Sequence, residues 1–161
     1  TKDSLDDLTV VVSKHQTKGK GRNGNIWENE ASLNLAFSIY KKFNNLDVKD
    51  KFMLNVISSL SVFQLLKENN LNKLTIKWPN DIMTGKEKIS GILIENSVKG
   101  KFINHSVIGV GINVNQKKFK DSNINLNRFP GALWGPSRNI SLKAHPLFIY
   151  KYKNFRNLTY K

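Results

Sequence analysis

The sequence predicts an α+β domain in which a mixed, largely antiparallel sheet packs against helices. Three observations support this class. Apolar residues alternate with polar or small ones over residues 32–40, and they recur every three or four positions over 50–69. Three further apolar segments, separated by short turns, follow between 74 and 115. Because the strands do not alternate with helices, the order excludes a repeated βαβ chain.

The first predicted elements are two strands joined by a long loop. "LTVVV" (8–12) is short, apolar and rich in β-branched residues, which predicts a buried strand. Residues 14–31 are polar and glycine-rich, which predicts a loop. "SLNLAFSIY" (32–40) predicts a strand with one buried face. The side chains expected on that face are Leu33, Leu35, Phe37 and Ile39.

An amphipathic helix is predicted over residues 50–69. Asp47 or Asp50 is expected to cap its start, and the Asn69–Asn70 pair marks its end. The apolar positions that predict its buried face are Phe52, Met53, Val56, Ile57, Leu60, Phe63 and Leu66.

Three strands are predicted after the helix, at 74–78, 88–96 and 102–115, with a hairpin turn in "NSVKGK" between the last two. We therefore expect a core domain over 1–125. Residues 126–161 carry three of the four prolines and show no clean period. Only a short basic helix at 147–158 is predicted there.

Composition narrows the function classes. The 161 residues fit one domain, and their net charge of +14 favours polyanionic partners such as nucleic acid. The lysines are scattered, however, and Asn and Ile are abundant, which also fits compositional drift. The lack of cysteine excludes disulfides, thiolate catalysis and Cys-ligated zinc. No long apolar run or signal-peptide pattern is present, so a cytoplasmic protein is expected.

The loop "GKGRNGNIW" (19–27) has its glycines at the spacing of a dinucleotide-binding fingerprint. That motif requires a helix directly after the loop to receive the pyrophosphate, whereas a strand is predicted here. A P-loop would require Lys and Ser or Thr after Gly24, where Asn25 and Ile26 stand. Both nucleotide motifs are therefore excluded.

Two cations, Lys20 and Arg22, alternate with glycines in this loop, so that backbone and charge can both approach an anionic ligand. Trp27 is a large residue to expose on a plain surface loop. These residues alone leave a ligand loop and a plain loop equally open.

A second constellation lies in "KWPNDIMTGKEKISGILIEN" (77–96). Pro79 ends a strand, and Asn80 and Asp81 then present polar groups at a sheet end. Lys88 begins the next strand, in which Gly91 leaves room against the backbone. The alternative is a tight turn followed by a surface lysine.

A third constellation is "VIGVGINVN" (107–115). Gly109 and Gly111 are two positions apart and lie on one face of a strand, which Asn113 continues. Such a face forms a smooth groove in which a ring or an extended chain could lie. The alternative is a bulge or a close strand crossing.

Taken together, these stretches resemble the biotin protein ligases. The matching motifs are "QTKGKGRNGNIW" (16–27), "KWPND" (77–81), "KISGILIE" (88–95) and "GVGINVN" (109–115), in the family's order and spacing. The resemblance covers about residues 8–120 and implies the α/β core shared with class II aminoacyl-tRNA synthetases. It also implies activation of biotin by MgATP to biotinyl-5′-AMP, followed by transfer to a lysine of the biotin carboxyl carrier protein of acetyl-CoA carboxylase. Neither a membrane nor nucleic acid is then an expected partner, whereas homodimers through sheet edges occur in the family.

The resemblance also implies roles for individual residues. Arg22 and Lys88 are the expected catalytic cations, and Asp81 is expected to orient or deprotonate the acceptor lysine. No metal ligands are assigned, because Mg²⁺ is expected with ATP. The implied biotin-binding residues are Gln16, Gly19, Lys20, Gly21, Arg22, Lys88, Gly91, Gly109 and Gly111. The implied ATP- or adenylate-binding residues are Trp27, Asn80, Lys88 and Asn113.

The chain departs from the family pattern in several places. Lys20 stands where Arg is commoner, and Asn23 and Asn25 stand where many members carry Arg. The upstream Ser-Thr-Asn segment, an N-terminal DNA-binding domain and the C-terminal β-barrel are not recognised, and only "NISLK" (139–143) is faintly similar to the sequence before the family's final helix. A truncated catalytic domain is therefore expected.

Two alternative functions remain at this point. A lipoate ligase or lipoyl transferase belongs to the same superfamily but prefers an R-R-x-x-G-G loop, which this chain lacks. A non-catalytic basic module that binds nucleic acid would account for the net charge and the interspersed aromatic residues.

Overall fold

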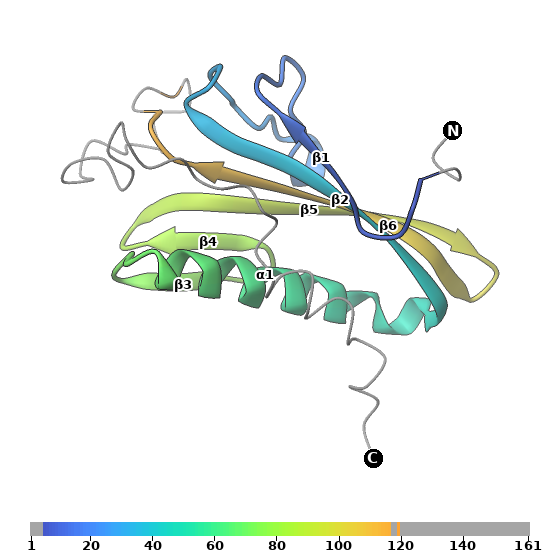
Figure 1. Ribbon diagram of the computed structural model, residues 1–161. Coiled ribbons are helices and arrows are strands. Elements are labelled where there is room, and N and C mark those ends of the chain that lie inside the picture. Colours follow the sequence, from blue (N-terminus) through green and yellow to red (C-terminus); the bar gives the residue numbers. More distant parts are fainter. Residues whose placement is uncertain (1–4, 117–118, 120–161) are drawn as a thin grey trace.

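The fold is a single six-stranded antiparallel sheet with one helix packed against it (Figure 1). The computed structural model describes residues 5–116 and 119. The strand order is β1-β2-β6-β5-β4-β3, and each neighbouring pair is antiparallel. The predicted fold class is therefore confirmed. The strands are β1 (Thr9–Ser13), β2 (Asn34–Asp47), β3 (Leu74–Lys77), β4 (Asp81–Thr84), β5 (Glu87–Lys99) and β6 (Phe102–Asn113).

The helix α1 (Lys51–Glu68) covers the β3–β5 side of the sheet and forms the hydrophobic core with it (Figure 1). On β6, Ile108, Val110 and Ile112 alternate with residues of the opposite face and are buried in that core. The other core residues are Ile39, Leu54, Ile57, Val62, Leu66, Leu71, Ile82, Ile89, Ile92 and Ile103. One face of the sheet thus packs against α1 in the hydrophobic core, and the opposite face is available for a binding site.

The helix was predicted correctly in position, but its buried face was predicted only in part. Phe52 and Leu60 were expected in the core, yet they are 43% and 46% exposed. The buried face instead includes Ser58 and Ser61, whose hydroxyls donate to the carbonyls of Leu54 and Ile57 at 2.6 and 2.7 Å. These bonds satisfy each serine within its own helix, so serines that look polar in the sequence can be buried.

The two predicted caps of α1 differ. The carboxylate of Asp47 accepts from the Lys49 amide at 3.0 Å, in a 3-10 turn, η3 (Val48–Asp50), that leads into the helix. Asp50 makes no side-chain capping bond. The helix ends at Glu68, and Asn70 takes a φ of 64°, as the Asn69–Asn70 pair predicted.

The sheet differs from the sequence prediction at three strands. The strand predicted as buried at 8–12 is the edge strand β1, in which Val11 and Val12 are 58% and 46% exposed. β2 continues to Asp47, beyond the predicted end at residue 40, with a register shift between Lys42 and Leu46. β4 was not predicted, because Asn80 and Asp81 were expected to follow the end of the strand at 74–78 and not to begin a new one. It has only four residues, too few for a clear alternation.

Some predictions lie outside the described residues. They concern the segment 126–161 and its helix at 147–158, together with the end of the core domain at 125. Within residues 5–116 and 119, the structure has no helix that is both long and apolar enough to cross a membrane.

Candidate functional site

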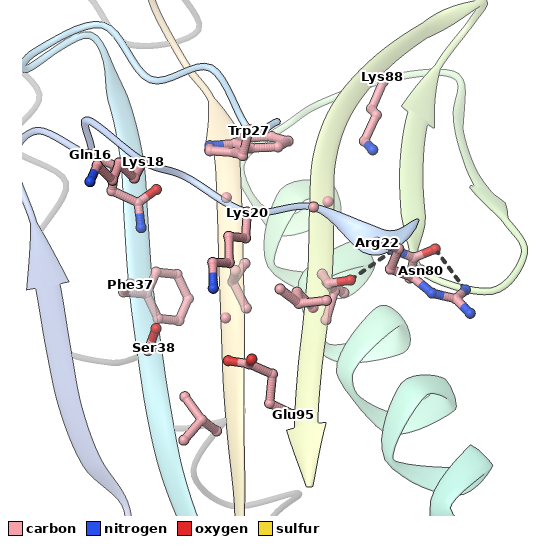
Figure 2. A pocket seen from close by; sticks show the side chains of 18 residues that line it. Gln16, Lys18, Lys20, Arg22, Trp27, Phe37, Ser38, Asn80, Lys88 and Glu95 are labelled. Carbon is pink, nitrogen blue, oxygen red and sulfur yellow. Dashed lines mark hydrogen bonds between the residues drawn. The ribbon is translucent and has the colours of Figure 1, made fainter. Parts of the chain in front are cut away.

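A cavity of about 250 Å³ opens on the sheet face opposite the core, between the loop after β1 and the central strands β5 and β6 (Figure 2). It brings together most of the predicted site residues from four separate stretches of the chain. Those that line it are Gln16, Lys20, Gly21, Arg22, Trp27, Asn80, Lys88, Gly91, Gly109 and Gly111.

Three predicted site residues do not line the cavity but contact residues that do. Gly19 accepts the Trp27 amide on its carbonyl at 2.9 Å. Asp81 forms an ion pair with Lys88, and Asn113 donates its amide to the Lys88 carbonyl at 3.1 Å. The structure therefore places all thirteen predicted residues in or directly behind one site.

The floor of the cavity is made of paired glycines. Gly91 on β5 lies opposite Gly111 on β6, and Gly109 lies two residues away on the same face. The β6 register is regular through Gly109 and Gly111 on both sides, which excludes the bulge that the sequence left open. A bare backbone surface thus runs across two strands, as the groove hypothesis predicted.

Trp27 occupies one part of this floor (Figure 2). A Cβ on Gly111 would overlap the Trp27 indole, and a Cβ on Gly91 would lie 3.1 Å from it. At Gly109 the nearest atoms are the Leu93 carbonyl at 3.5 Å and the Ser38 hydroxyl at 3.8 Å. The floor is therefore divided: Gly91 and Gly111 cradle the indole, whereas Gly109 remains open.

The loop that carries Trp27 is a hydrogen-bonded hairpin. Gly21 donates to the Asn25 carbonyl at 2.7 Å, and a short 3-10 turn, η2 (Arg22–Gly24), forms its tip. Asn23 and Gly24 both take positive φ, 56° and 81°, which such a tight tip requires. β2 follows this loop, so the prediction of a strand after it is confirmed.

Asn80 positions Arg22. The Arg22 guanidinium donates to the Asn80 side-chain oxygen at 3.4 Å (Figure 2). The Asn80 amide donates to the Ile92 carbonyl at 2.8 Å, and the Ile92 amide donates back to the Asn80 carbonyl at 3.0 Å. Asn80 is therefore held against the central strand β5 by two hydrogen bonds to Ile92, and the Arg22 guanidinium contacts it.

Lys88 is held more firmly than Arg22. Its ammonium lies 2.8 Å from Asp81, and the two side chains are 31% and 21% exposed. Lys88 also lies 5.8 Å from the Trp27 ring centroid, within cation–π range. It is thus a partly buried cation in a wall of the site, and the alternative of an isolated surface lysine is wrong.

Sequence reasoning missed several lining residues. Lys18 lies in the basic loop, and Glu95 ends the "KISGILIE" motif, so both carried a signal. Phe37 and Ser38 lie within an ordinary strand, and nothing in the sequence around them indicated a site. The others are the apolar residues Ile92, Leu93, Val107 and Val110.

A second cavity, of about 580 Å³, adjoins the first, with which it shares Gln16 and Trp27. Asn29 lines it and is 7% exposed, yet neither polar atom of its side chain has a hydrogen-bond partner. Buried amides in folded proteins are normally paired. The two cavities therefore meet at Gln16 and Trp27, and the second contains an unpaired amide.

Comparison with known proteins agrees with this geometry. The family model of the biotin/lipoate A/B protein ligases matches residues 1–113. The chain belongs to this family. Within the family, it is 31% identical over 136 residues to the bifunctional ligase/repressor BirA of Bacillus subtilis, covering 84% of this chain and 39% of that protein. It is also 31% identical over 113 residues to a biotin–[acetyl-CoA-carboxylase] ligase of Mycobacterium tuberculosis, covering 68% and 41% of the two chains.

Among solved structures, the biotin protein ligase of Aquifex aeolicus in complex with biotin and ATP superposes with a TM-score of 0.75 and 29% identity. The match covers 96% of this chain and 65% of that one. This member of the biotin/lipoate ligase family thus spans about two fifths of the length of the curated relatives named above.

Proposed function

We propose that this chain forms the catalytic core of a biotin protein ligase. It activates biotin with MgATP to biotinyl-5′-AMP and then transfers biotin to a lysine of the biotin carboxyl carrier protein of acetyl-CoA carboxylase. The observation that carries the proposal is the cavity in which Lys88, Lys20 and Arg22 converge over a floor of bare glycine backbone. The relatives include a biotin–[acetyl-CoA-carboxylase] ligase and a biotin protein ligase, which favours biotin over lipoate as the substrate of this chain.

The first step joins two anions. An oxygen of the biotin carboxylate attacks the α-phosphorus of ATP, and pyrophosphate leaves with its charge. Fixed cations offset both the repulsion and the charge that develops in the transition state. Lys88, held by Asp81, is the cation placed in advance, and Arg22 is the second. Mg²⁺ would enter with the phosphates of ATP, since the described residues group no three His, Asp or Glu side chains as ligands.

The second step requires a neutral amine. The acceptor lysine attacks the carbonyl carbon of biotinyl-AMP, an amide bond forms, and AMP leaves. A lysine is protonated at neutral pH, so a base must take its proton. Asp81 serves as that base once Lys88 turns from it toward the anionic adenylate, because Lys88 lines the cavity and Asp81 lies directly behind it.

The divided floor suggests where each substrate lies. Gly109, with Ser38 and Phe37 beside it, forms the open floor for the fused ring of biotin. Gln16 and the backbone at Lys20 and Gly21 line the loop side of the cavity, facing this floor. We assign Trp27, Asn80 and Asn113 to the adenylate side. Of these, Trp27 also lines the adjoining cavity, which leaves room for part of the nucleotide. We further propose a cytoplasmic protein that can pair through its exposed sheet edges, β1 and β3.

The test is incubation of the chain with biotin, MgATP and a biotin carboxyl carrier domain. Biotinyl-AMP is followed by chromatography and biotinylated carrier by streptavidin blot. We expect both products, with lipoate unable to replace biotin. A chain that neither binds biotin nor forms the adenylate would contradict the proposal. A salt titration then tests the nucleic-acid alternative: polyanion binding falls steeply with ionic strength, whereas binding to the biotin floor changes little.

A further inference from the structure

One carboxylate lies among the cations that line the first cavity. Of the described lining residues, Glu95 alone is negatively charged, and four are positively charged, namely Lys18, Lys20, Arg22 and Lys88. Both substrates of the proposed reaction are anions, so a carboxylate here opposes their binding unless it meets a hydrogen-bond donor. In the part of the chain that the structure describes, the Glu95 side chain forms no ion pair or hydrogen bond. Its oxygens are therefore available to a ligand.

Glu95 lies at the opposite end of the cavity from Lys88. On β5, Gly91 and Glu95 are four residues apart, which places them on one face of the strand at a separation of about 13 Å. The Lys88 ammonium belongs to the Gly91 end, because it lies 3.3 Å from the position of a Cβ on Gly91. Figure 2 shows the Glu95 carboxylate pointing into the other end, on the side of Ser38. The two ends of the cavity thus carry opposite charges on the same strand.

The open glycine floor lies between these two ends. Gly109 pairs with Leu93, which is midway between Gly91 and Glu95 in the β5–β6 register. If the fused ring of biotin rests on Gly109 and its carboxylate meets Lys88, its ureido group extends toward Glu95. The carboxyl and ureido carbons of biotin are eight bonds apart, which spans about 10 Å in an extended chain. Adding one hydrogen bond of about 3 Å gives the separation of the two backbone positions.

The chemistry of the ureido group matches the Glu95 end. The group has two N–H donors and one carbonyl acceptor, whereas a carboxylate only accepts hydrogen bonds. Glu95 can therefore accept from a ureido N–H in a charge-assisted bond. The Ser38 hydroxyl, 3.8 Å from the position of a Cβ on Gly109, can donate to the ureido carbonyl. The dithiolane ring of lipoate offers no donor, so lipoate would desolvate the carboxylate without replacing its hydrogen bonds.

Building on the proposed function, we propose that Glu95 is a specificity-determining residue that accepts a hydrogen bond from the ureido ring of biotin. Lys88 and Glu95 together select a ligand that is anionic at one end and donates a hydrogen bond about 10 Å away. Glu95 thereby favours biotin over lipoate, and it takes no part in the reaction at the phosphate.

The experiment pairs a change in the protein with a change in the ligand. Calorimetry measures the Kd of biotin, and of biotin methylated on both ureido nitrogens, for the unchanged chain and for Glu95→Ala. A hydrogen bond to a charged group typically contributes about 10- to 100-fold in affinity. We expect Glu95→Ala to weaken biotin by this factor and to leave the methylated analogue unchanged, so the ratio of the two Kd values falls by the same factor. Lipoate should bind Glu95→Ala no more weakly than the unchanged chain.

Two further variants separate charge from size and position. Glu95→Gln keeps the length of the side chain and one acceptor oxygen but removes the charge, so its effect on biotin should be smaller than that of Glu95→Ala. Glu68→Gln removes a carboxylate outside the cavity, at the end of α1, where Glu68 accepts from Gln64 at 3.1 Å. This matched control should leave both Kd values unchanged.

The inference is overturned if Glu95→Ala, shown to be folded by circular dichroism, binds biotin as tightly as the unchanged chain does. It is also overturned if this variant weakens biotin and the methylated analogue equally, because Glu95 would then act on the cavity as a whole and not on the ureido donors. In both outcomes the unchanged chain still binds biotin and the proposed function stands. If the unchanged chain binds no biotin, the proposed function and this inference fail together.

Discussion

The two proposed catalytic cations are held in different ways. Lys88 lies near the start of the long central strand β5. Its side chain is partly buried and forms an ion pair with Asp81 at 2.8 Å. Arg22 lies in a three-residue turn at the tip of a loop, is exposed, and has one long hydrogen bond of 3.4 Å to Asn80. A strand fixes a charge before the ligand arrives, whereas a loop tip becomes ordered only when the ligand supplies contacts. We therefore expect Lys88 to act as a placed charge, already in position before the ligand binds. We expect Arg22 to act as a clamp, contacting the ligand only after the loop has closed over it.

The largest effect should come from Lys88→Ala. Loss of one preorganised charge contact to a transition state typically lowers the rate about 10²–10³-fold. Formation of biotinyl-AMP, measured by pyrophosphate release, should fall by this factor. Lys86→Ala, an exposed lysine two residues away, is the matched control and should leave the rate unchanged. Full activity of Lys88→Ala would remove its assigned role.

Arg22→Ala should have a smaller effect on the chemical step and a clearer effect on ligand retention. Because the guanidinium is exposed in the unliganded site, it contributes only after the loop closes. We expect biotinyl-AMP to dissociate about 10- to 100-fold faster, measured by stopped-flow fluorescence. Asn25→Ala, in the same loop, controls for loop composition. Equal losses of chemical rate in Arg22→Ala and Lys88→Ala would contradict the distinction between a clamp and a placed charge.

The divided floor predicts different outcomes at neighbouring glycines. Gly111→Ala introduces a Cβ that overlaps Trp27, so the indole must leave its place. Overpacking of this kind costs about 1–3 kcal/mol of unfolding free energy, measured by urea denaturation. At Gly109 the nearest atoms lie at 3.5 and 3.8 Å, which is ordinary contact. Gly109→Ala should therefore retain stability and lose biotin affinity, measured by calorimetry. The opposite assignment of the two effects would refute the division.

The smallest expected signal is a change in hydrogen exchange over residues 19–27. The amides of Gly21, Asn25 and Trp27 are already bonded within the hairpin, so only some of the loop can gain protection. We expect slower exchange there with biotin and ATP, and little change over residues 90–97, where β5 pairs continuously with β6. A loop with unchanged protection would count against closure.

Much of the fold could be predicted, because its signals are local. The alternation in 32–40, the three-to-four period in 50–69 and the turn in 96–101 each lie within one stretch. The structure confirms the strand, the helix and the hairpin that they predict, with the turn itself at residues 100–101. The short strand β4 and the extension of β2 could not be predicted in this way. Each depends on a partner strand for its hydrogen bonds, and a four-residue segment has too few positions to show a period.

The candidate site divides in the same manner. The sequence alone determined which residue types were available: a basic glycine loop, a Lys–Gly strand, and two glycines on one face of another strand. Only the tertiary structure decided that Asp81 pairs with Lys88, that Asn80 supports Arg22, and that Trp27 covers Gly111 but leaves Gly109 open. It also decided that the serines of α1 face the core while Phe52 faces outward toward Trp78. Periodicity and motif spacing are properties of neighbouring residues. The contacts of Arg22, Trp27 and Phe52 instead join residues 26 to 84 positions apart, and the pair of Asp81 and Lys88 joins two strands. Packing alone selects these contacts and the helix face that the sheet covers.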